Sequence, residues 1–223
     1  DMGCGSGRRA KFMAPIVGNL HCIEPSAVAL NQAENNLSMF TNCTFECATA
    51  SENSLKESSQ DFGYSLGVLH HTPDTVEALN KCTSTLKQGA PFLVYLYYSL
   101  DNKPLWYRWL WLISDAIRKQ VSRLPFPLKF FISQLISLFV YLPLARFSLL
   151  CEKLGINVKN FPLTDYRSKA FYILRNDALD IFGTRLEHRF SKKQITEMLT
   201  NAGLHNITFS ENPPFWTAVA YKK

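Results

Sequence analysis

The chain begins with three glycines at alternate positions behind an acid, in the stretch DMGCGSG of residues 1–7. Glycine carries no Cβ, so a backbone with this spacing can turn tightly and approach a ligand closely. Residues 8–16 can form a short helix, which places the turn directly before a helix. A glycine turn that opens a helix is typical of α/β proteins that bind a nucleotide-containing ligand, and this constrains the fold more than any other feature.

The rest of the sequence agrees with an α/β fold. After the glycine turn, apolar runs of strand length alternate with amphipathic runs of helix length. Strands are predicted at 20–23, 44–47, 64–69 and 92–97, and helices at 26–37 and from Pro73 to Gly89. Strands separated by helices of this length pair in parallel through right-handed crossovers. A capping box at Ser191 starts a last helix, and two strands joined around Pro213-Pro214 end the chain.

Composition narrows the class further. A chain of 223 residues that is 47% hydrophobic and 19% charged predicts one globular domain, or one domain with a large insertion. The six cysteines are scattered without a CxxC pair, which favours free thiols in a reducing compartment and no metal site. With no visible signal peptide, we expect a cytoplasmic protein, either free or in peripheral contact with a membrane.

The net charge of +6 is localised. Residues 102–146 contain seven basic residues and one acidic residue, so this segment accounts for the whole net charge. One local basic surface is predicted, rather than the uniform basic coat of a nucleic-acid-binding protein. We therefore expect no nucleic-acid partner.

The same region has an unusual apolar pattern. Pro104 opens a helix whose tryptophans and isoleucines share a face, and a nearly apolar run follows from Phe130 to Leu142. Ser133 and Ser137 align with Lys129 at a spacing of four, which predicts a narrow solvated stripe along this run. Thirteen residues before Pro143 are too few to span a bilayer, which needs about 20. Two interpretations remain open: a buried or lid-like helix pair, and a peripheral membrane or lipid-substrate element built on residues 102–146.

The glycine turn alone does not identify its ligand. Residues 5–10 satisfy the dinucleotide pattern G-x-G-x-x-G/A, and Glu24 is placed to accept the ribose hydroxyls of either NAD or another nucleoside cofactor. Asp1 suits a ligand with a positively charged end and is poorly placed beside a pyrophosphate. The small-residue loop after the strand in DFGYSLGVLHH, residues 61–71, and the turn LKQGA, residues 86–90, are further features of the site.

Taken in order, the motifs DMGCGSG, IEPS, DFGYSLGVLHHTPD and LKQGAPFLVYLYY resemble those of the class I S-adenosylmethionine-dependent methyltransferases, most closely the type 11 group. The resemblance is strong over residues 1–100, and the two closing strands are similar to the antiparallel end of that family's sheet. There are departures: the usual LKPGG is LKQGA here, and Thr49 stands where an acid is common.

The resemblance implies a Rossmann-like α/β sheet with three parts. Residues 1–100 would form the S-adenosylmethionine-binding core, 101–190 a helical insertion or lid that covers the acceptor, and 191–223 the helix and antiparallel strand pair that complete the core. Because the family's glycine turn follows its first strand, the resemblance also implies an N-terminally truncated chain whose first strand is missing ahead of Asp1.

The resemblance also assigns site residues. The methionine part of the cofactor would be surrounded by Asp1, Gly3, Cys4 and Gly5. Glu24 would hold the ribose, and Pro25 would lie beside the adenine. The adenine would be flanked by Ala48 and Thr49, and the sulfonium would lie near Leu66 and Gly67.

The expected reaction is transfer of a methyl group to a small-molecule or lipid-like acceptor. Displacement at an activated methyl needs alignment of the acceptor, and a base only where the acceptor is protonated. His70 and His71 follow the strand that points at the methyl group and are the candidates for acid–base work or substrate contact; packing or capping of the next helix is their alternative role. The alternative functions are an NAD-dependent oxidoreductase and a non-catalytic membrane-surface module.

Overall fold

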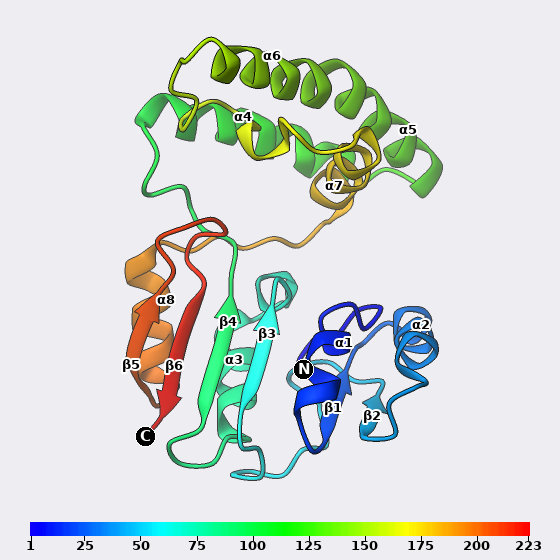
Figure 1. Cartoon of the computed structure of the whole chain (residues 1–223), viewed down its shortest axis with the longest axis vertical. Helices are drawn as coiled ribbons and strands as arrows, with labels where there is room; N and C mark the ends of the chain where they lie inside the picture. Colours follow the sequence, from blue (N-terminus) through cyan, green and yellow to red (C-terminus); the bar gives the residue numbers. More distant parts are fainter. The chain divides into compact units, whose positions relative to one another are not determined.

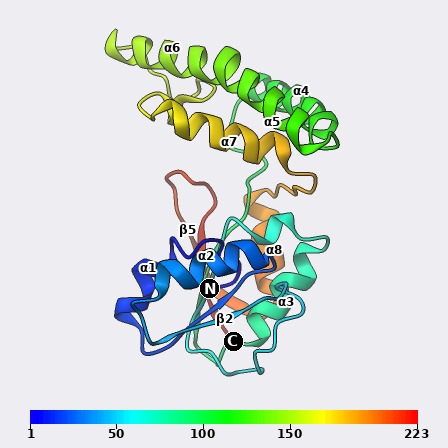
Figure 2. The same cartoon turned by 90° about the vertical axis from the view of Figure 1, so that its right-hand side faces the viewer.

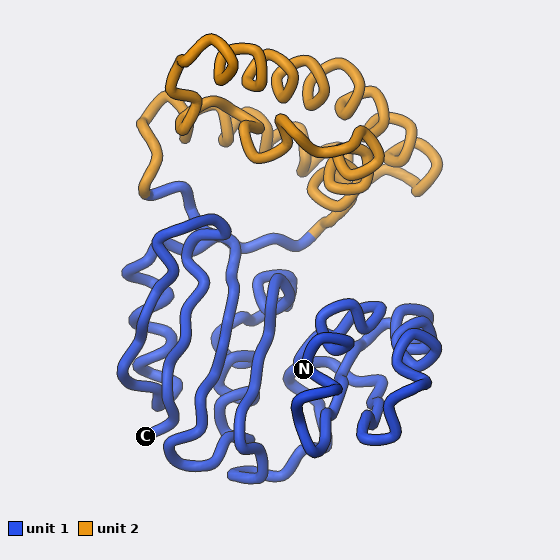
Figure 3. The backbone as a smooth tube through the Cα atoms, viewed as in Figure 1, with its two compact units in different colours: residues 1–101, 186–223 blue, residues 102–185 orange.

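The computed structural model describes residues 1–223, which divide into two compact units (Figure 3). The first unit comprises residues 1–101 and 186–223, and the second residues 102–185. The sequence placed the end of the insertion at 190, whereas residues 186–190 belong to the first unit. The reason is backbone pairing: the Phe190 amide donates to the Tyr97 carbonyl at 2.9 Å, and the Ser99 amide donates to the Phe190 carbonyl at 2.9 Å.

The first unit is mixed α/β, as the sequence predicts (Figure 1). Its strands form a parallel pair and a four-stranded sheet of order β3-β4-β6-β5, in which β3 and β4 are parallel and β6 is antiparallel to both neighbours. The pair consists of β1 (Leu20–Ile23) and β2 (Cys43–Glu46); the sheet consists of β3 (Gly63–Leu66), β4 (Pro91–Tyr95), β5 (Leu204–Phe209) and β6 (Ala218–Lys222).

The three longest helices of this unit begin at polar caps. The Ser26 hydroxyl accepts from the Ala29 amide, and Ser191 forms the predicted capping box with Gln194. Asp74 accepts from two amides, so its helix begins after Asp74 and not at Pro73, and it ends at Ser84, before Gly89. The elements are α1 (Ala10–Met13), η1 (Ala14–Ile16), α2 (Ala27–Leu37), η2 (Leu69–His71), α3 (Thr75–Ser84) and α8 (Lys192–Asn201).

Two cores hold this unit together. Apolar residues of α3 and α8 pack on β4 and β6, with Leu79, Leu199 and Phe92 among the fully buried side chains. A second core joins α1 and α2 to β1, around Ala33 and Leu37. Burying side chains of this size contributes about 1.5–3 kcal/mol each, so the two cores fix the strand ends that form the site.

Residues 1–3 connect the two sheets. Met2 pairs with Ile23 of β1, its amide donates to the Tyr64 carbonyl of β3 at 2.9 Å, and its carbonyl accepts from the Ser65 hydroxyl at 2.9 Å. Next to this bridge, β1 and β3 are separated by a narrow cavity of about 40 Å³. The expectation of a further strand ahead of Asp1 stays a prediction.

The second unit is helical (Figure 2). Helix α7 packs against α4, α5 and the π turn η3, and the core between them contains Val121, Tyr141 and Leu174. The elements are α4 (Leu105–Val121), α5 (Phe126–Ile136), η3 (Ser137–Tyr141), α6 (Leu142–Lys153), η4 (Thr164–Tyr166) and α7 (Phe171–Gly183).

Pro143 does not end the apolar helix, contrary to the expectation from the sequence. Elements α5, η3 and α6 form one continuous helix, Phe126–Lys153, of 28 residues. Proline lacks a backbone N–H donor, and its ring crowds the carbonyl four residues before it. The π turn, in which the Leu142 amide donates to the Ser137 carbonyl, carries the helix past this point. By length and composition this helix could cross a membrane, and 22% of its most apolar window is buried.

Candidate cofactor site

The glycine loop of residues 1–7 turns through left-handed backbone conformations, with φ of +82° at Gly3 and +54° at Gly5. A Cβ on Gly3 would lie 2.4 Å from Val68 Cγ1, so this position accepts no side chain. A Cβ on Gly5 would meet nothing within 4 Å, because this part of the loop faces open space. The loop therefore packs on the end of β3 on one side and leaves a free surface on the other.

Hydrogen bonds attach this loop to the carboxyl end of β1. The amides of Gly3 and Cys4 both donate to the Ile23 carbonyl, at 2.8 and 3.0 Å. Cys4 is buried, and a hydrogen bond with Cys22, together with burial, raises the pKa of its thiol above the ordinary value. Cys4 is thus a neutral packing residue of the loop, and its contribution to a ligand is through the backbone.

A cavity of about 250 Å³ lies against the loop. It is lined by Asp1, Gly3, Cys4, Gly5, Ser6, Arg8, Arg9 and Leu66. The Asp1 Oδ2 atom is buried and has no hydrogen-bond partner. A buried carboxylate oxygen without a partner is costly, and a positively charged group that reached this oxygen would remove the cost.

Glu24 follows β1 and does not itself line the cavity, but it contacts Gly5, which does. Its two carboxylate oxygens accept from the Gly5 amide at 2.9 Å and from the Ser26 amide at 3.1 Å. Each oxygen keeps lone-pair capacity for a further hydroxyl, so the carboxylate is oriented by the backbone and still able to hold a ribose. Pro25 comes next, and its carbonyl accepts from the Cys47 thiol at 3.7 Å, which holds the ends of β1 and β2 together.

The predicted adenine residues follow β2. The Thr49 hydroxyl donates to Glu52 Oε2 at 2.9 Å, and Ala48 is partly buried against the core. Neither residue lines the 250 Å³ cavity, which is formed by the loop and β3. Their role in adenine recognition stays a prediction.

Leu66 and Gly67 end β3 on the other side of the loop. Leu66 lines the cavity, and the Gly67 amide donates to the Tyr95 carbonyl of β4 at 3.1 Å. Gly67 has a φ of +83°, which turns the chain away from the strand at this point. The structure therefore brings Asp1, Gly3, Cys4, Gly5 and Leu66 to one cavity.

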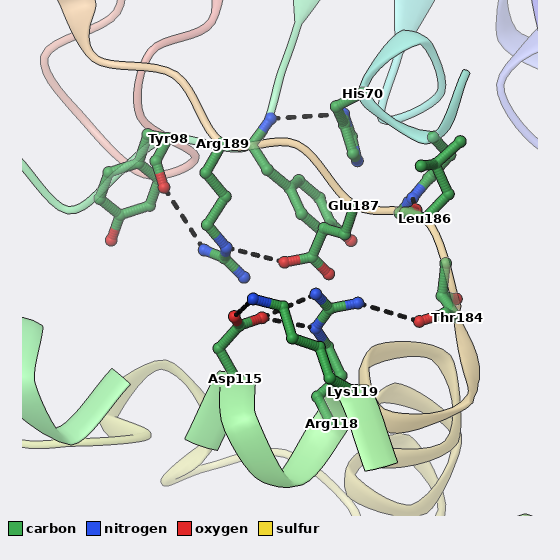
Figure 4. Close-up of polar contacts among 11 residues, drawn as sticks. His70, Tyr98, Asp115, Arg118, Lys119, Thr184, Leu186, Glu187 and Arg189 are labelled. Carbon is green, nitrogen blue, oxygen red and sulfur yellow. Dashed lines mark hydrogen bonds and ion pairs between the residues drawn. The ribbon is translucent and has the colours of Figure 1, made fainter. Parts of the chain in front are cut away.

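His70 is fully buried after β3 (Figure 4). Its Nδ1 accepts from the Tyr97 amide at 3.3 Å, so in the neutral ring the proton is on Nε2, a buried atom without a partner. Burial lowers the pKa of His70 to about 2, and the nearby His71, Arg189 and His188 act in the same direction. His70 is thus a neutral hydrogen-bond donor and not a base.

His71 has the opposite tautomer. Its Nδ1 lies 2.8 Å from the Leu186 carbonyl, which can only accept, so Nδ1 carries the proton and Nε2 is an acceptor. The 3₁₀ turn Leu69–His71 thus places one donor and one acceptor imidazole side by side, with ring centroids 4.1 Å apart. Neither ring lines the 250 Å³ cavity, and the catalytic role of this pair stays a prediction.

Sequence reasoning missed the groups around these histidines. The His70 ring stacks on Tyr97 with centroids 3.8 Å apart, and the Arg189 guanidinium lies 5.2 Å from the centre of the Tyr97 ring. Arg189 also pairs with Glu187 at 2.8 Å (Figure 4). Arg189 follows Tyr97 by more than ninety residues, so no local motif could have joined them. Arg8 and Arg9, at the cavity, were also missed although they follow the glycine pattern directly.

Comparison with known families gives one match over the first unit. The family model described as "Methyltransferase domain" matches residues 1–94, which covers the glycine loop, His70, His71 and all but the last residue of β4. No curated protein matches this sequence. The resemblance to the type 11-like class I methyltransferases is thereby confirmed.

Solved structures give the same fold. A SAM-dependent methyltransferase structure from Methanosarcina mazei aligns over 100% of this chain and 90% of its own, with 16% identity and a TM-score of 0.55. The CurJ carbon methyltransferase aligns over 99% of this chain and 46% of its own, with 13% identity and a TM-score of 0.54. The [4+2]-cyclase SpnF aligns over 42% of this chain, with 21% identity and a TM-score of 0.40, and the chain spans 36% of that protein's length. The first two likenesses, to the Methanosarcina mazei structure and to CurJ, establish the Rossmann-like fold.

Proposed function

We propose that this chain, in which residues 1–94 carry a class I methyltransferase domain of the type 11-like group, transfers a methyl group from S-adenosylmethionine to a small-molecule or lipid-like acceptor. One observation supports this most: the buried Asp1 Oδ2 atom has no hydrogen-bond partner, and Asp1 is one of the residues that line a cavity of about 250 Å³ on the glycine loop. The ammonium of a methionine moiety satisfies that oxygen, whereas a pyrophosphate is repelled by it.

The residues around the cavity fit the cofactor in three parts. Asp1 would accept from the ammonium, and Arg8 or Arg9, which line the same cavity, would pair with the carboxylate. Glu24, oriented by the Gly5 and Ser26 amides, would accept from the ribose hydroxyls. Leu66 offers an apolar wall on the β3 side of the cavity, where the sulfonium end is expected.

S-adenosylmethionine supplies a methyl group already activated by a positively charged sulfur, so the chain's own residues mainly align the acceptor and exclude water. His71 Nε2 is the acceptor that would take a proton from a hydroxyl or acidic carbon of the substrate. His70 Nε2 is a buried donor that would hold a substrate oxygen without changing its own charge.

The surroundings of β3 and β4 favour an apolar or aromatic acceptor. Tyr95 and Tyr97 lie beside the His70 ring, with centroids 6.4 and 3.8 Å away, and burial raises the pKa of Tyr95. A Cβ on Gly67 would lie 3.8 Å from Tyr95 Cδ1, so this ring lies next to the turn that follows β3. Aromatic faces in this position contribute apolar contact and little charge. That the insertion covers the acceptor stays a prediction.

Calorimetry with S-adenosylhomocysteine tests the proposal. We expect one site per chain and no heat with NAD. Glu24→Gln keeps one acceptor oxygen but loses the charge, and we expect affinity to fall by about 10-fold or more, the typical loss for a charge-assisted hydrogen bond. Glu34→Gln, at an exposed position of α2, is the matched control and should bind like the wild type.

Two outcomes contradict the proposal or one of its contacts, and a folding control accompanies them. Binding of NAD without any response to S-adenosylhomocysteine overturns the proposal in favour of an oxidoreductase. Equal affinity of Glu24→Gln and Glu34→Gln contradicts the assigned ribose contact. A circular-dichroism spectrum of Glu24→Gln that matches the wild type ensures that lost affinity reports the contact and not unfolding.

A further inference from the structure

Helix α5, the π turn and α6 expose a row of large apolar side chains along their outer length. The row consists of Phe131, Leu135, Phe139, Phe147, Leu150 and Leu154. Steps of three or four residues keep neighbours on one face of a helix. The one longer step, from Phe139 to Phe147, is two turns, because the π turn takes one residue more than an α turn. Phe139 is 69% exposed, so this row has no cover within the chain.

The opposite, inner row of the same helix is small and polar. It consists of Ser133, Ser137, Tyr141, Ala145 and Ser148, all of them buried. Ser133 and Ser137 were expected from the sequence to form a solvated stripe, but both are buried. Ser148, in the same row, donates to Thr164 Oγ1 outside this helix at 3.0 Å. A helix that buries serines and exposes phenylalanines has the polarity of a helix surrounded by lipid, where small residues pack inside.

Helix α4 shows the same inversion. Its buried residues include Asp115 and Arg118, which form an ion pair at 2.7 Å, with Lys119 2.8 Å from the other Asp115 oxygen (Figure 4). Its exposed face carries large apolar side chains at helical spacing. They are Trp106, Trp109, Ile113 and Ile117. Trp109 is 67% exposed, and tryptophan prefers the boundary between lipid headgroups and acyl chains.

Charge distinguishes the second unit as well. Residues 102–185 contain thirteen basic and five acidic residues, a net charge of +8, whereas the first unit contains eleven basic and thirteen acidic residues, a net charge of −2. Arg108, Arg123 and Lys153 are exposed and have no acidic partner among the ion pairs of the unit. A basic surface beside exposed tryptophans and phenylalanines is complementary to a bilayer that contains anionic lipids.

We infer that residues 102–185 bind the surface of an anionic lipid bilayer, with the outer row of α5–α6 and the Trp106–Ile117 row of α4 entering the headgroup boundary. Repulsion between two units of charge +8 disfavours a second copy of the chain as the cover of this face. The inference does not depend on the proposed methyl transfer, since it rests on the second unit alone.

The helix is expected to lie in the membrane surface and not to cross it. Its uncharged stretch from Phe130 to Ala145 has sixteen residues, about 24 Å at 1.5 Å each, which is less than the roughly 30 Å of a hydrocarbon core. The charges at both ends are tied to the unit: Lys129 Nζ donates to the Gly183 carbonyl at 3.2 Å, and Arg146 Nη1 donates to the Arg167 carbonyl at 2.7 Å.

Vesicle sedimentation with the full chain tests this inference. The probes are phosphatidylcholine vesicles with one quarter phosphatidylserine, and vesicles of phosphatidylcholine alone, at low and high salt. We expect binding to the anionic vesicles that weakens with salt. The triple variant F131S/F139S/F147S should bind at least about tenfold more weakly, because three inserted rings are lost. The charge variant R108Q/R123Q/K153Q should lose a similar factor on anionic vesicles only.

The first unit provides matched controls. F12S/V28S/M39S removes three apolar side chains that are even more exposed than the three phenylalanines, and K11Q/K56Q/K193Q removes three exposed charges. Both should bind vesicles like the wild type. Three results overturn the inference. They are no binding to anionic vesicles, equal losses of vesicle binding in the variants of the second unit and in the controls, and a dimer in sedimentation velocity that F131S/F139S/F147S dissociates. Protein that stays in the membrane after carbonate extraction contradicts the surface placement.

Discussion

Helices α8 and α5 show how differently the two units are built. In α8, Ile195 and Leu199 are buried while the Lys193–Glu197 pair faces water. In α5, Ser133 is buried and Phe131 is exposed. The first arrangement is the one that water dictates, because apolar surface leaves the solvent. The second leaves large apolar side chains exposed, which is the observation behind the lipid surface that we propose for the second unit.

The largest expected difference between the units concerns glycines with positive φ. In the first unit, Gly3→Ala places a Cβ 2.4 Å from Val68 and should cost about 3 kcal/mol from overpacking and backbone strain. In the second unit, Gly155 has a φ of +78° with nothing within 4 Å, so Gly155→Ala should cost only about 1 kcal/mol. Urea unfolding followed by circular dichroism measures both; equal costs would show that the loop is not held against Val68.

Lowering the pH should weaken the first unit before the second. His70 has a folded pKa of about 2, far below its ordinary value, so the unfolded chain takes up a proton below about pH 6.5 and the folded chain does not. The free energy of unfolding should therefore fall by about 2 kcal/mol between pH 7 and pH 5.

Asp115 of the second unit gives the contrast. Burial opposes its ionisation, but hydrogen bonds from Lys119 and Arg118 outweigh this, and its pKa lies below the ordinary value. The contribution of Asp115 to the free energy of unfolding is therefore fully present above the ordinary carboxyl pKa, and it is lost only in more acidic solution. Urea titrations at pH 7 and 5 compare the units, with His70→Gln as the variant in which the loss should shrink. If His70→Gln loses as much free energy of unfolding between pH 7 and pH 5 as the wild type, a group other than His70 causes the pH dependence.

The smallest predicted effects have opposite signs. Ser65 of the first unit is buried and donates to the Met2 carbonyl at 2.9 Å, so Ser65→Ala should destabilise by about 1 kcal/mol. Ser137 of the second unit is buried and its hydroxyl has no partner, so Ser137→Ala should stabilise by up to about 1 kcal/mol. Thermal unfolding of both variants measures this; destabilisation by Ser137→Ala would indicate a hydrogen bond that the folded chain makes.

Local patterns predicted the first unit well. Strand and helix periods, the Ser26 and Ser191 caps and the antiparallel closing strands are confirmed, because each depends on neighbours in sequence. The cavity at Asp1, Gly3, Gly5 and Leu66 also follows from two motifs at parallel strand ends. The contacts of His70 with Tyr97 and Arg189 do not, because they join segments that are distant along the chain.

The second unit was harder to predict for a physical reason. Its polarity is reversed, so a serine stripe indicated a solvated face where the structure has a packed one. Pro143 indicated a helix end, and the preceding π turn removes that signal by carrying the helix past the proline. Periodicity locates the two faces of a helix, but only the surrounding structure decides which face is inside.

Hydrogen exchange of the full chain tests the central claim most directly, by comparing the free protein with two additions. With S-adenosylhomocysteine, protection should rise in residues 1–7 and 20–26 and stay unchanged in 126–154. With anionic vesicles, protection should rise in 105–117 and 126–154 and stay unchanged in the glycine loop. Vesicle protection confined to the first unit, or S-adenosylhomocysteine protection that leaves residues 1–7 unaffected, would contradict the assignment of a cofactor site to one unit and a lipid surface to the other.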